Sequence, residues 1–150
     1  MRAPSLLNLL LGCSLGASGA PSVWAQSPAK VAGDDIISLA TDRTWAISFY
    51  GNPDNPGLTN VWDFRKNGSV CARGAGSKAG EKCADEGKWN VTGDRLCWEL
   101  TWMGEGAGTK AACSYVARIP NERYQLQNEK NPDLSFAVFK VLQAQPPSAR

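Results

Sequence analysis

Strict alternation of apolar and polar residues marks the segment from Arg95 to Trp102. One face of an extended chain would carry Leu96, Trp98, Leu100 and Trp102, and the other would carry Cys97, Glu99 and Thr101. The same period of two runs through residues 45–50. Side chains two positions apart on a strand point to the same side, so this alternation is typical of strands with one buried face. The sequence therefore predicts a fold built from β-strands.

Short turn motifs separate the predicted strands. Asn67-Gly68 lies between residues 61–66 and 69–73 and is a strong hairpin signal, because both central residues of a type I′ turn need positive φ. A two-residue turn there would place Phe64 opposite Cys71 and Trp62 opposite Arg73. Thr92-Gly93-Asp94 joins a second hairpin, which comprises residues 88–91 and 95–102.

Further strands are predicted over residues 112–119, 124–127 and 135–142, which brings the total to about eight. Eight antiparallel strands joined in sequence can close into an up-and-down barrel, which leaves no unpaired edge. An open sandwich is the alternative. A short helix over residues 34–40, capped by Asp34, is expected before the first strand.

The N-terminus has the parts of a secretory signal peptide. Arg2 is followed by a short leucine-rich run and then by small residues up to Ala25. We expect residues 1–25 to be the signal peptide and cleavage to follow Ala25, so that the mature protein is periplasmic or secreted. In the alternative, the stretch before Cys13 is a lipobox and Cys13 carries a lipid.

The remaining chain divides by composition. Residues 26–43 form a polar lead-in with the short helix, and residues 44–142 form the barrel domain. Residues 143–150 form a tail that is expected to be disordered. No segment after the leader is long and apolar enough to predict a membrane span.

Five cysteines are present, and removal of the leader takes Cys13 away. An even number in a small exported domain predicts two disulfides. Of the three possible pairings we favour Cys71–Cys83 with Cys97–Cys113, because each pair closes a short loop. A metal site is not predicted, since the chain has no histidine and no C-x-x-C spacing.

Charge and residue types exclude several functions. The leader removes only one charged residue, Arg2, and the rest is close to neutral, which argues against a nucleic-acid partner. The absence of histidine excludes Ser-His-Asp and Cys-His catalysis. We predict no catalytic residue and no cofactor. If the chain is an enzyme, its chemistry would have to depend on carboxylates such as Glu81, Asp85 and Glu86.

Two hairpin motifs and a strand entry resemble a known fold family. Residues 87–96 resemble the G-x-W-x-V-x-G-D-x-L hairpin of small bacterial periplasmic lipocalin-like (calycin) domains of unknown function. Trp62-x-Phe64 with Asn67-Gly68-Ser69 resembles the hairpin before it, and Thr44-Trp45 resembles the strand entry. Arg43 stands where that family usually has glycine. The resemblance covers residues 40–142 and implies an all-β, lipocalin-like antiparallel barrel.

The chain also resembles, more loosely, small exported barrels that inhibit secreted metalloproteases. Their inhibitory N-terminal arm would correspond to residues 26–33. No motif of that arm carries over residue by residue.

The aromatic residues divide into expected core and expected site. Trp45 and Trp89 match structural positions of the lipocalin-like resemblance, and the predicted core is Trp45, Ile47, Phe49, Phe64 and Trp89. The candidate ligand-binding residues are Trp62, Arg73, Trp98, Trp102 and Glu99. Trp62 and Arg73 would form a cation–π pair across the first hairpin.

These observations favour a non-catalytic binding protein that holds a small apolar or aromatic ligand in the barrel. The alternative is a protease-inhibitor-like protein that acts by contact with a periplasmic or secreted protein. A small hydrolase or isomerase that uses carboxylates comes third.

Overall fold

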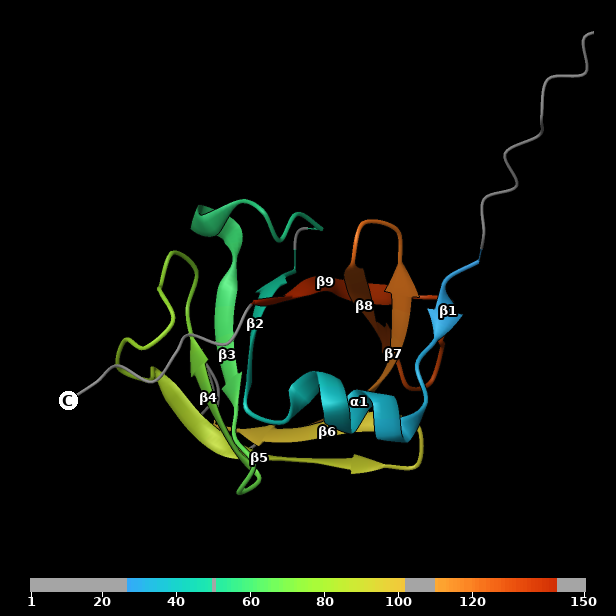
Figure 1. Cartoon of the computed structure of the whole chain (residues 1–150), viewed down its shortest axis with the longest axis horizontal. Helices are drawn as coiled ribbons and strands as arrows, with labels where there is room; N and C mark the ends of the chain where they lie inside the picture. Colours follow the sequence, from blue (N-terminus) through green and yellow to red (C-terminus); the bar gives the residue numbers. More distant parts are fainter. Residues whose placement is uncertain (1–26, 50, 102–109, 143–150) are drawn as a thin grey trace, which may run out of the picture.

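A computed structural model describes residues 27–49, 51–101 and 110–142. Eight antiparallel strands form a closed up-and-down barrel, as the sequence predicted (Figure 1). They are β2 (Arg43–Ser48), β3 (Asn60–Phe64), β4 (Ser69–Arg73), β5 (Asp85–Thr92), β6 (Arg95–Leu100), β7 (Lys110–Ile119), β8 (Arg123–Asn128) and β9 (Ser135–Leu142). Each strand pairs with the next along the chain, and β9 pairs with β2 to complete the ring.

Three short elements accompany the barrel. The extra strand β1 (Ala29–Lys30) pairs with the end of β7, at residues beyond those that pair with β6. The helix α1 (Gly33–Ala40) follows and lies across one end of the barrel (Figure 1). Its Ile36 side chain is fully buried. A 3-10 helix, η1 (Pro56–Leu58), lies in the connection between β2 and β3. We call the end opposite α1 the loop end, because residues 49–59 and 74–84 connect strands there.

The helix begins one residue earlier than expected. Its N-cap is Ala32, and the Gly33 N–H donates 3.0 Å to the Asp94 carboxylate in the turn between β5 and β6. Asp34 lies in the first turn, where its charge favours the helix dipole, but it is not the cap. The expectation that Asp34 caps the helix was wrong because a side chain distant in sequence binds the first N–H.

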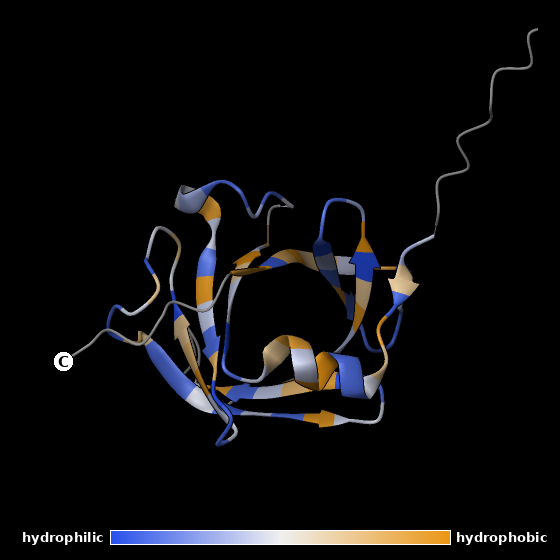
Figure 2. Cartoon of the chain, in the orientation of Figure 1, coloured by the Kyte–Doolittle hydropathy of each residue, from blue (hydrophilic) through white to orange (hydrophobic). Residues whose placement is uncertain are grey.

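Aromatic side chains fill the barrel interior next to α1. The rings of Trp45 and Phe139 stack with centroids 3.9 Å apart, and Tyr124 stacks on the other side of Phe139. Phe64 lies 4.5 Å from Trp45 and 5.6 Å from Trp89. Apolar and polar residues alternate along the strands, visible as bands of contrasting colour in Figure 2, so each strand directs its apolar side chains to this core.

The indole N–H groups of two core tryptophans are both hydrogen-bonded. Trp45 Nε1 donates to the Leu39 carbonyl of α1 at 2.8 Å, and Trp89 Nε1 donates to the Arg65 carbonyl at 2.9 Å. Buried polar groups need such partners. These bonds fix α1 and the β3–β4 turn to the barrel.

The predicted core residues lie inside the barrel with one exception. Trp45, Ile47, Phe64 and Trp89 are buried. Phe49 is 37% exposed, so its assignment to the core was wrong. β2 ends at Ser48, and the chain leaves the sheet before Phe49 can continue the alternation. Phe49 instead stacks loosely on Phe136 at the loop end.

The first hairpin is present with a register different from the predicted one. Trp62 pairs with Ala72, and Phe64 pairs with Val70. The loop has three residues rather than two: Gly68 alone takes positive φ, at 80°, and its N–H donates to the Arg65 carbonyl. The Asn67 side chain accepts a hydrogen bond from the Ser69 N–H instead of supplying a second left-handed residue. Arg73 therefore faces away from Trp62, and the predicted cation–π pair is not formed.

The structure shows why the first position of the G-x-W hairpin motif, Gly87, is a glycine. A Cβ atom at this position of β5 would lie 1.7 Å from the Glu99 carbonyl oxygen of β6. Only a residue without a side chain permits this approach of backbone to backbone.

Both predicted disulfides, Cys71–Cys83 and Cys97–Cys113, are formed. Such cross-links indicate an oxidising environment. Among the described residues, α1 falls short of the length and hydropathy that crossing a bilayer requires.

Candidate functional site

The candidate ligand residues do not form one site. Trp62 is buried inside the barrel and meets the half-buried Trp98 edge to face, at a centroid distance of 5.7 Å. Glu99 is exposed on the outer face of β6 and does not reach that interior. Arg73 is buried on the outer face of β4. Trp102 lies outside the described residues.

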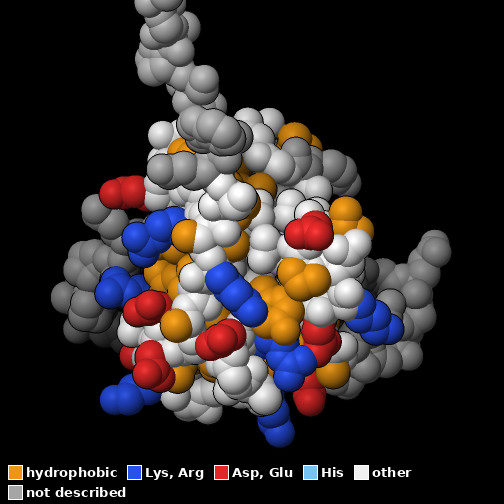
Figure 3. All heavy atoms as spheres, turned by 90° about the vertical axis from the view of Figure 1, so that its right-hand side faces the viewer, with side chains coloured by type: hydrophobic (Ala, Val, Ile, Leu, Met, Phe, Trp, Pro, Cys, Tyr) orange, Lys and Arg blue, Asp and Glu red, His pale blue; other side chains and the backbone are white. Residues whose placement is uncertain are grey.

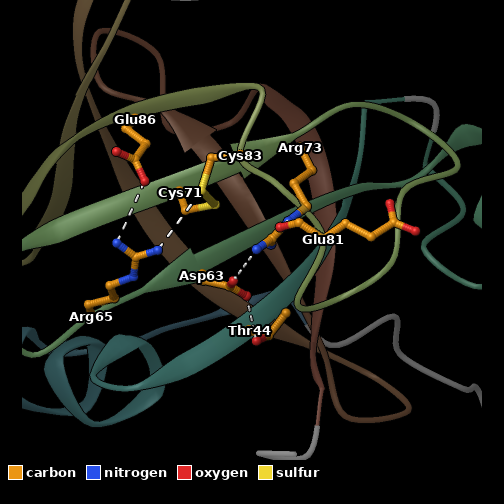
Figure 4. Close-up of a disulfide and its surroundings, with 8 residues drawn as sticks. All are labelled: Thr44, Asp63, Arg65, Cys71, Arg73, Glu81, Cys83 and Glu86. Carbon is orange, nitrogen blue, oxygen red and sulfur yellow. Dashed lines mark hydrogen bonds and ion pairs between the residues drawn. A yellow bond between two sulfur atoms is a disulfide. The ribbon is translucent and has the colours of Figure 1, made fainter.

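Arg73 belongs to a chain of polar groups across three strands. The register places Thr44 beside Asp63, and Asp63 beside Cys71, all on the outer face. Thr44 Oγ1 donates to one oxygen of Asp63 at 2.7 Å, and Arg73 Nη2 lies 2.7 Å from the other (Figure 4). Both carboxylate oxygens are thus bonded, which offsets the cost of removing the ion pair from water.

Residues 74–84, which we call the cover loop, lie over the Arg73 guanidinium. Arg73 Nε donates to the Glu81 carbonyl of this loop at 2.6 Å, and the Arg73 side chain is only 4% exposed. The remaining guanidinium nitrogen, Nη1, is buried and has no acceptor within the described part of the chain. An unmet buried donor costs about 1–3 kcal/mol, so Nη1 offers a hydrogen bond that an incoming acceptor would gain.

The Cys71–Cys83 disulfide closes the cover loop. Cys71 is fully buried on β4, and Cys83 lies near the end of the loop, two residues before β5. Two backbone bonds help to place the loop: the Ala84 N–H donates to the Ala72 carbonyl at 3.0 Å, and the Gly76 N–H donates to the Pro56 carbonyl at 2.9 Å. The loop itself is rich in small and charged residues and has little apolar surface of its own.

Arg65 lies on the solvent side of the disulfide. One of its terminal nitrogens is 3.9 Å from Cys83 Sγ, and the other is 3.7 Å from the Glu86 carboxylate (Figure 4). The Arg65 and Glu86 side chains are both about half exposed or more, so water screens this pair and its contribution to stability is small.

These groups surround a pocket of about 630 Å³, which we call the Arg73 pocket. Its lining carries four carboxylates (Asp63, Glu81, Asp85 and Glu86) and three basic groups (Arg65, Arg73 and Lys82). The volume is in the range of small-molecule sites, and the nearly balanced charges suit a ligand with both donors and acceptors.

Metal binding is a weaker use of the same residues. The sulfurs of Cys71 and Cys83 and a Glu86 oxygen lie within 4.8 Å of one another. Metals bind thiolates, however, and both sulfurs are held in the disulfide.

Comparisons with protein-family models, with curated proteins and with solved structures found no match. The closed eight-stranded antiparallel barrel is consistent with a calycin-like fold. The resemblance to lipocalin-like domains rests on the sequence motifs alone.

Sequence reasoning selected Arg73 but missed its partners Thr44 and Asp63. The assumed two-residue turn set Arg73 opposite Trp62, and the register actually formed sets it diagonally across from Asp63. One signal did point to this place: the Cys71–Cys83 pairing tethers a polar loop directly beside the strand that ends at Arg73.

Proposed function

We propose that this chain is an exported, non-catalytic binding protein and that its ligand occupies the Arg73 pocket. The ligand is a small zwitterion, with a carboxylate for Arg73 and an ammonium group for the surrounding carboxylates; free amino acids and dipeptides are of this class. The observation that carries the proposal is the buried guanidinium whose Nη1 lacks a protein acceptor among the described residues, beside a pocket of suitable volume.

Charge complementarity supports the zwitterion. An arginine guanidinium binds carboxylates through several parallel hydrogen bonds. Asp63 already compensates one positive charge, so the lining as a whole does not favour a polyanion. The face that carries β1 and β7 likewise shows basic and acidic side chains interspersed, with no field of one sign (Figure 3).

An apolar ligand inside the barrel was the sequence-based expectation. The stacked rings of Trp45, Phe139 and Tyr124 occupy the interior beside α1, and Phe64 and Trp89 extend that cluster. Their contacts with one another favour packing over ligand binding at this level. The ligand proposal therefore moves to the outer face.

The other two expectations have less support. An inhibitory arm has to protrude, whereas Ala29 and Lys30 pair with β7 and Val31 is buried. A carboxylate enzyme needs groups free to exchange a proton, whereas Asp85 accepts hydrogen bonds from Thr101 and Glu86 pairs with Arg65.

The test is an NMR titration of isotopically labelled protein with the free amino acids and a set of dipeptides. It is run on the native chain and on a Cys71→Ser/Cys83→Ser variant, which lacks the disulfide that closes the cover loop over Arg73. We expect amide shift changes at residues 63, 73 and 80–86. The Arg73→Lys variant keeps the positive charge but loses the planar guanidinium that binds a carboxylate through two hydrogen bonds. It should bind about tenfold more weakly. Arg43→Lys, an exposed change on the same barrel wall, is the matched control and should bind normally. The proposal is overturned if no panel member shifts these amides, or if apolar ligands shift only the Trp62 and Trp98 indoles.

A further inference from the structure

We propose that the Cys71–Cys83 disulfide is a redox switch for the Arg73 pocket: a dithiol reductant opens the cover loop and exposes Arg73. This inference concerns regulation of the proposed binding site and rests on that function for its biological meaning. The geometric part of the switch can be tested without a ligand.

The disulfide is the main restraint on the cover loop. Most of its residues are exposed. Three groups of hydrogen bonds anchor it to the rest of the described chain. They are the Arg73 bond to the Glu81 carbonyl, the Gly76 N–H bonds to the Pro56 and Thr59 carbonyls, and the Ala84 N–H bond to the Ala72 carbonyl. Ordering a polar chain costs conformational entropy at every residue, and a cross-link removes much of that cost by restricting the open state. Without the cross-link we expect the open state to dominate.

Of the two sulfurs, Cys83 Sγ is the one that an incoming thiolate can reach. Cys71 is fully buried, whereas Cys83 is partly exposed. The Arg65 guanidinium, 3.9 Å from Cys83 Sγ, attracts an incoming thiolate and stabilises the thiolate that Cys83 later becomes.

The exchange runs in two steps. A thiolate of the dithiol bonds to Cys83 Sγ, and the bond between the two protein sulfurs breaks to leave Cys71 as a thiolate that takes up a proton. The second thiolate of the dithiol then displaces Cys83, so that the reductant leaves as a cyclic disulfide with two electrons fewer.

The second disulfide provides a natural control. Cys97 and Cys113 are direct partners in the β6–β7 ladder, whose backbone hydrogen bonds hold the two strands together on either side. Loss of that cross-link lowers stability but releases no loop over Arg73. The two disulfides should therefore differ in what their reduction exposes.

The experiment measures modification of arginine by phenylglyoxal, located by peptide mass spectrometry, in the full chain. In the oxidised protein Arg73 should react far more slowly than the exposed Arg43. In a Cys71→Ser/Cys83→Ser variant its rate should rise about tenfold or more, toward that of Arg43. A Cys97→Ser/Cys113→Ser variant should keep Arg73 protected.

A fold control accompanies the variant. Near-ultraviolet circular dichroism reports the Trp45–Phe139 stack and shows whether the barrel is intact. If the serine variant unfolds, brief dithiothreitol treatment of the native chain followed by alkylation gives the same comparison. Continued protection of Arg73 in folded protein that lacks the Cys71–Cys83 bond would overturn the switch. Failure of the amino-acid titration both in oxidised protein and in the folded Cys71→Ser/Cys83→Ser variant would overturn only the proposed function.

Discussion

Two regions of the barrel wall differ in how far their outward-facing residues are buried. Along β3 and β4 nearly every residue is buried, those directed outward as well as those directed inward. Along β5 and β6 burial alternates, and outward residues such as Lys88 and Glu99 are exposed. The difference lies in the connections: long loops at residues 49–59 and 74–84 fold over β2–β4, whereas a tight turn joins β5 to β6.

Strands β3 and β4 are covered on both faces, so their buried polar groups need hydrogen-bond partners within the protein. Polar groups that face water on β5 and β6 need no protein partner, but those under the cover loop must find one. Asp63 meets this requirement fully, with Thr44 and Arg73, and Arg73 meets it only in part. The lack of an acceptor for Arg73 Nη1 therefore points to a binding site, because this nitrogen is buried. On β5 and β6 an unpaired polar group would be hydrated and would indicate nothing.

The inner face of the covered wall should give the largest effect on stability. Phe64→Ala removes a 1% exposed ring that contacts Trp45, Trp62 and Trp89. We expect a loss of about 3–5 kcal/mol in the free energy of unfolding, measured by urea denaturation. Leu134→Ala, at a residue that is 59% exposed, should cost less than about 0.5 kcal/mol. Equal losses for the two would mean that the interior is not the packed core described above.

The outer face of the same wall should give an intermediate effect. A double-mutant cycle with Asp63→Asn and Arg73→Met should yield a coupling free energy of about 1–3 kcal/mol, because Arg73 is almost fully buried and Asp63 mostly so. The cycle of Glu86→Gln and Arg65→Met, an exposed pair on the same wall, should yield about 0–0.5 kcal/mol. Similar coupling in the two cycles would show that the cover loop does not exclude water.

The smallest effect concerns the loop that joins β2 to β3. A hydrogen bond from Lys140, with the charges of Lys140 and Arg123, lowers the pKa of Asp54 below its ordinary value of 3.8. A lowered pKa means that these pairs stabilise the fold above that ordinary value and lose their effect as pH falls through the lowered one. Because Asp54 is at the surface, the effect on unfolding should be slight and should weaken with salt.

Carboxyl NMR titration checks this assignment directly. Lys140→Ala should move the pKa of Asp54 back toward its ordinary value. Lys66→Ala, at the opposite end of the barrel, should leave the pKa of Asp54 unchanged. If the pKa of Asp54 is the same in the Lys140→Ala variant as in the native chain, this loop is not anchored to β9.

Local signals were enough to predict the strands, because the clearest of them show a period of two. Residues 96–100 and 45–47 predict their buried faces without knowledge of their neighbours, and the turns show where strands end. The failures came where one residue decided the outcome. Gly68 alone takes positive φ, which lengthens the turn and shifts the β3–β4 pairing by one position.

By itself, then, the sequence determined the strands, since periodicity is a property of neighbouring residues. It favoured the closed barrel over an open sandwich and one of three cysteine pairings, and the structure forms both favoured arrangements. Only the tertiary structure decided which polar groups meet. Thr44, Asp63 and Arg73 come from three strands, and the Glu81 carbonyl comes from a loop that is folded back over them. Such a site depends on register and on loop placement, which are set by packing across the whole barrel and leave no local pattern in the chain.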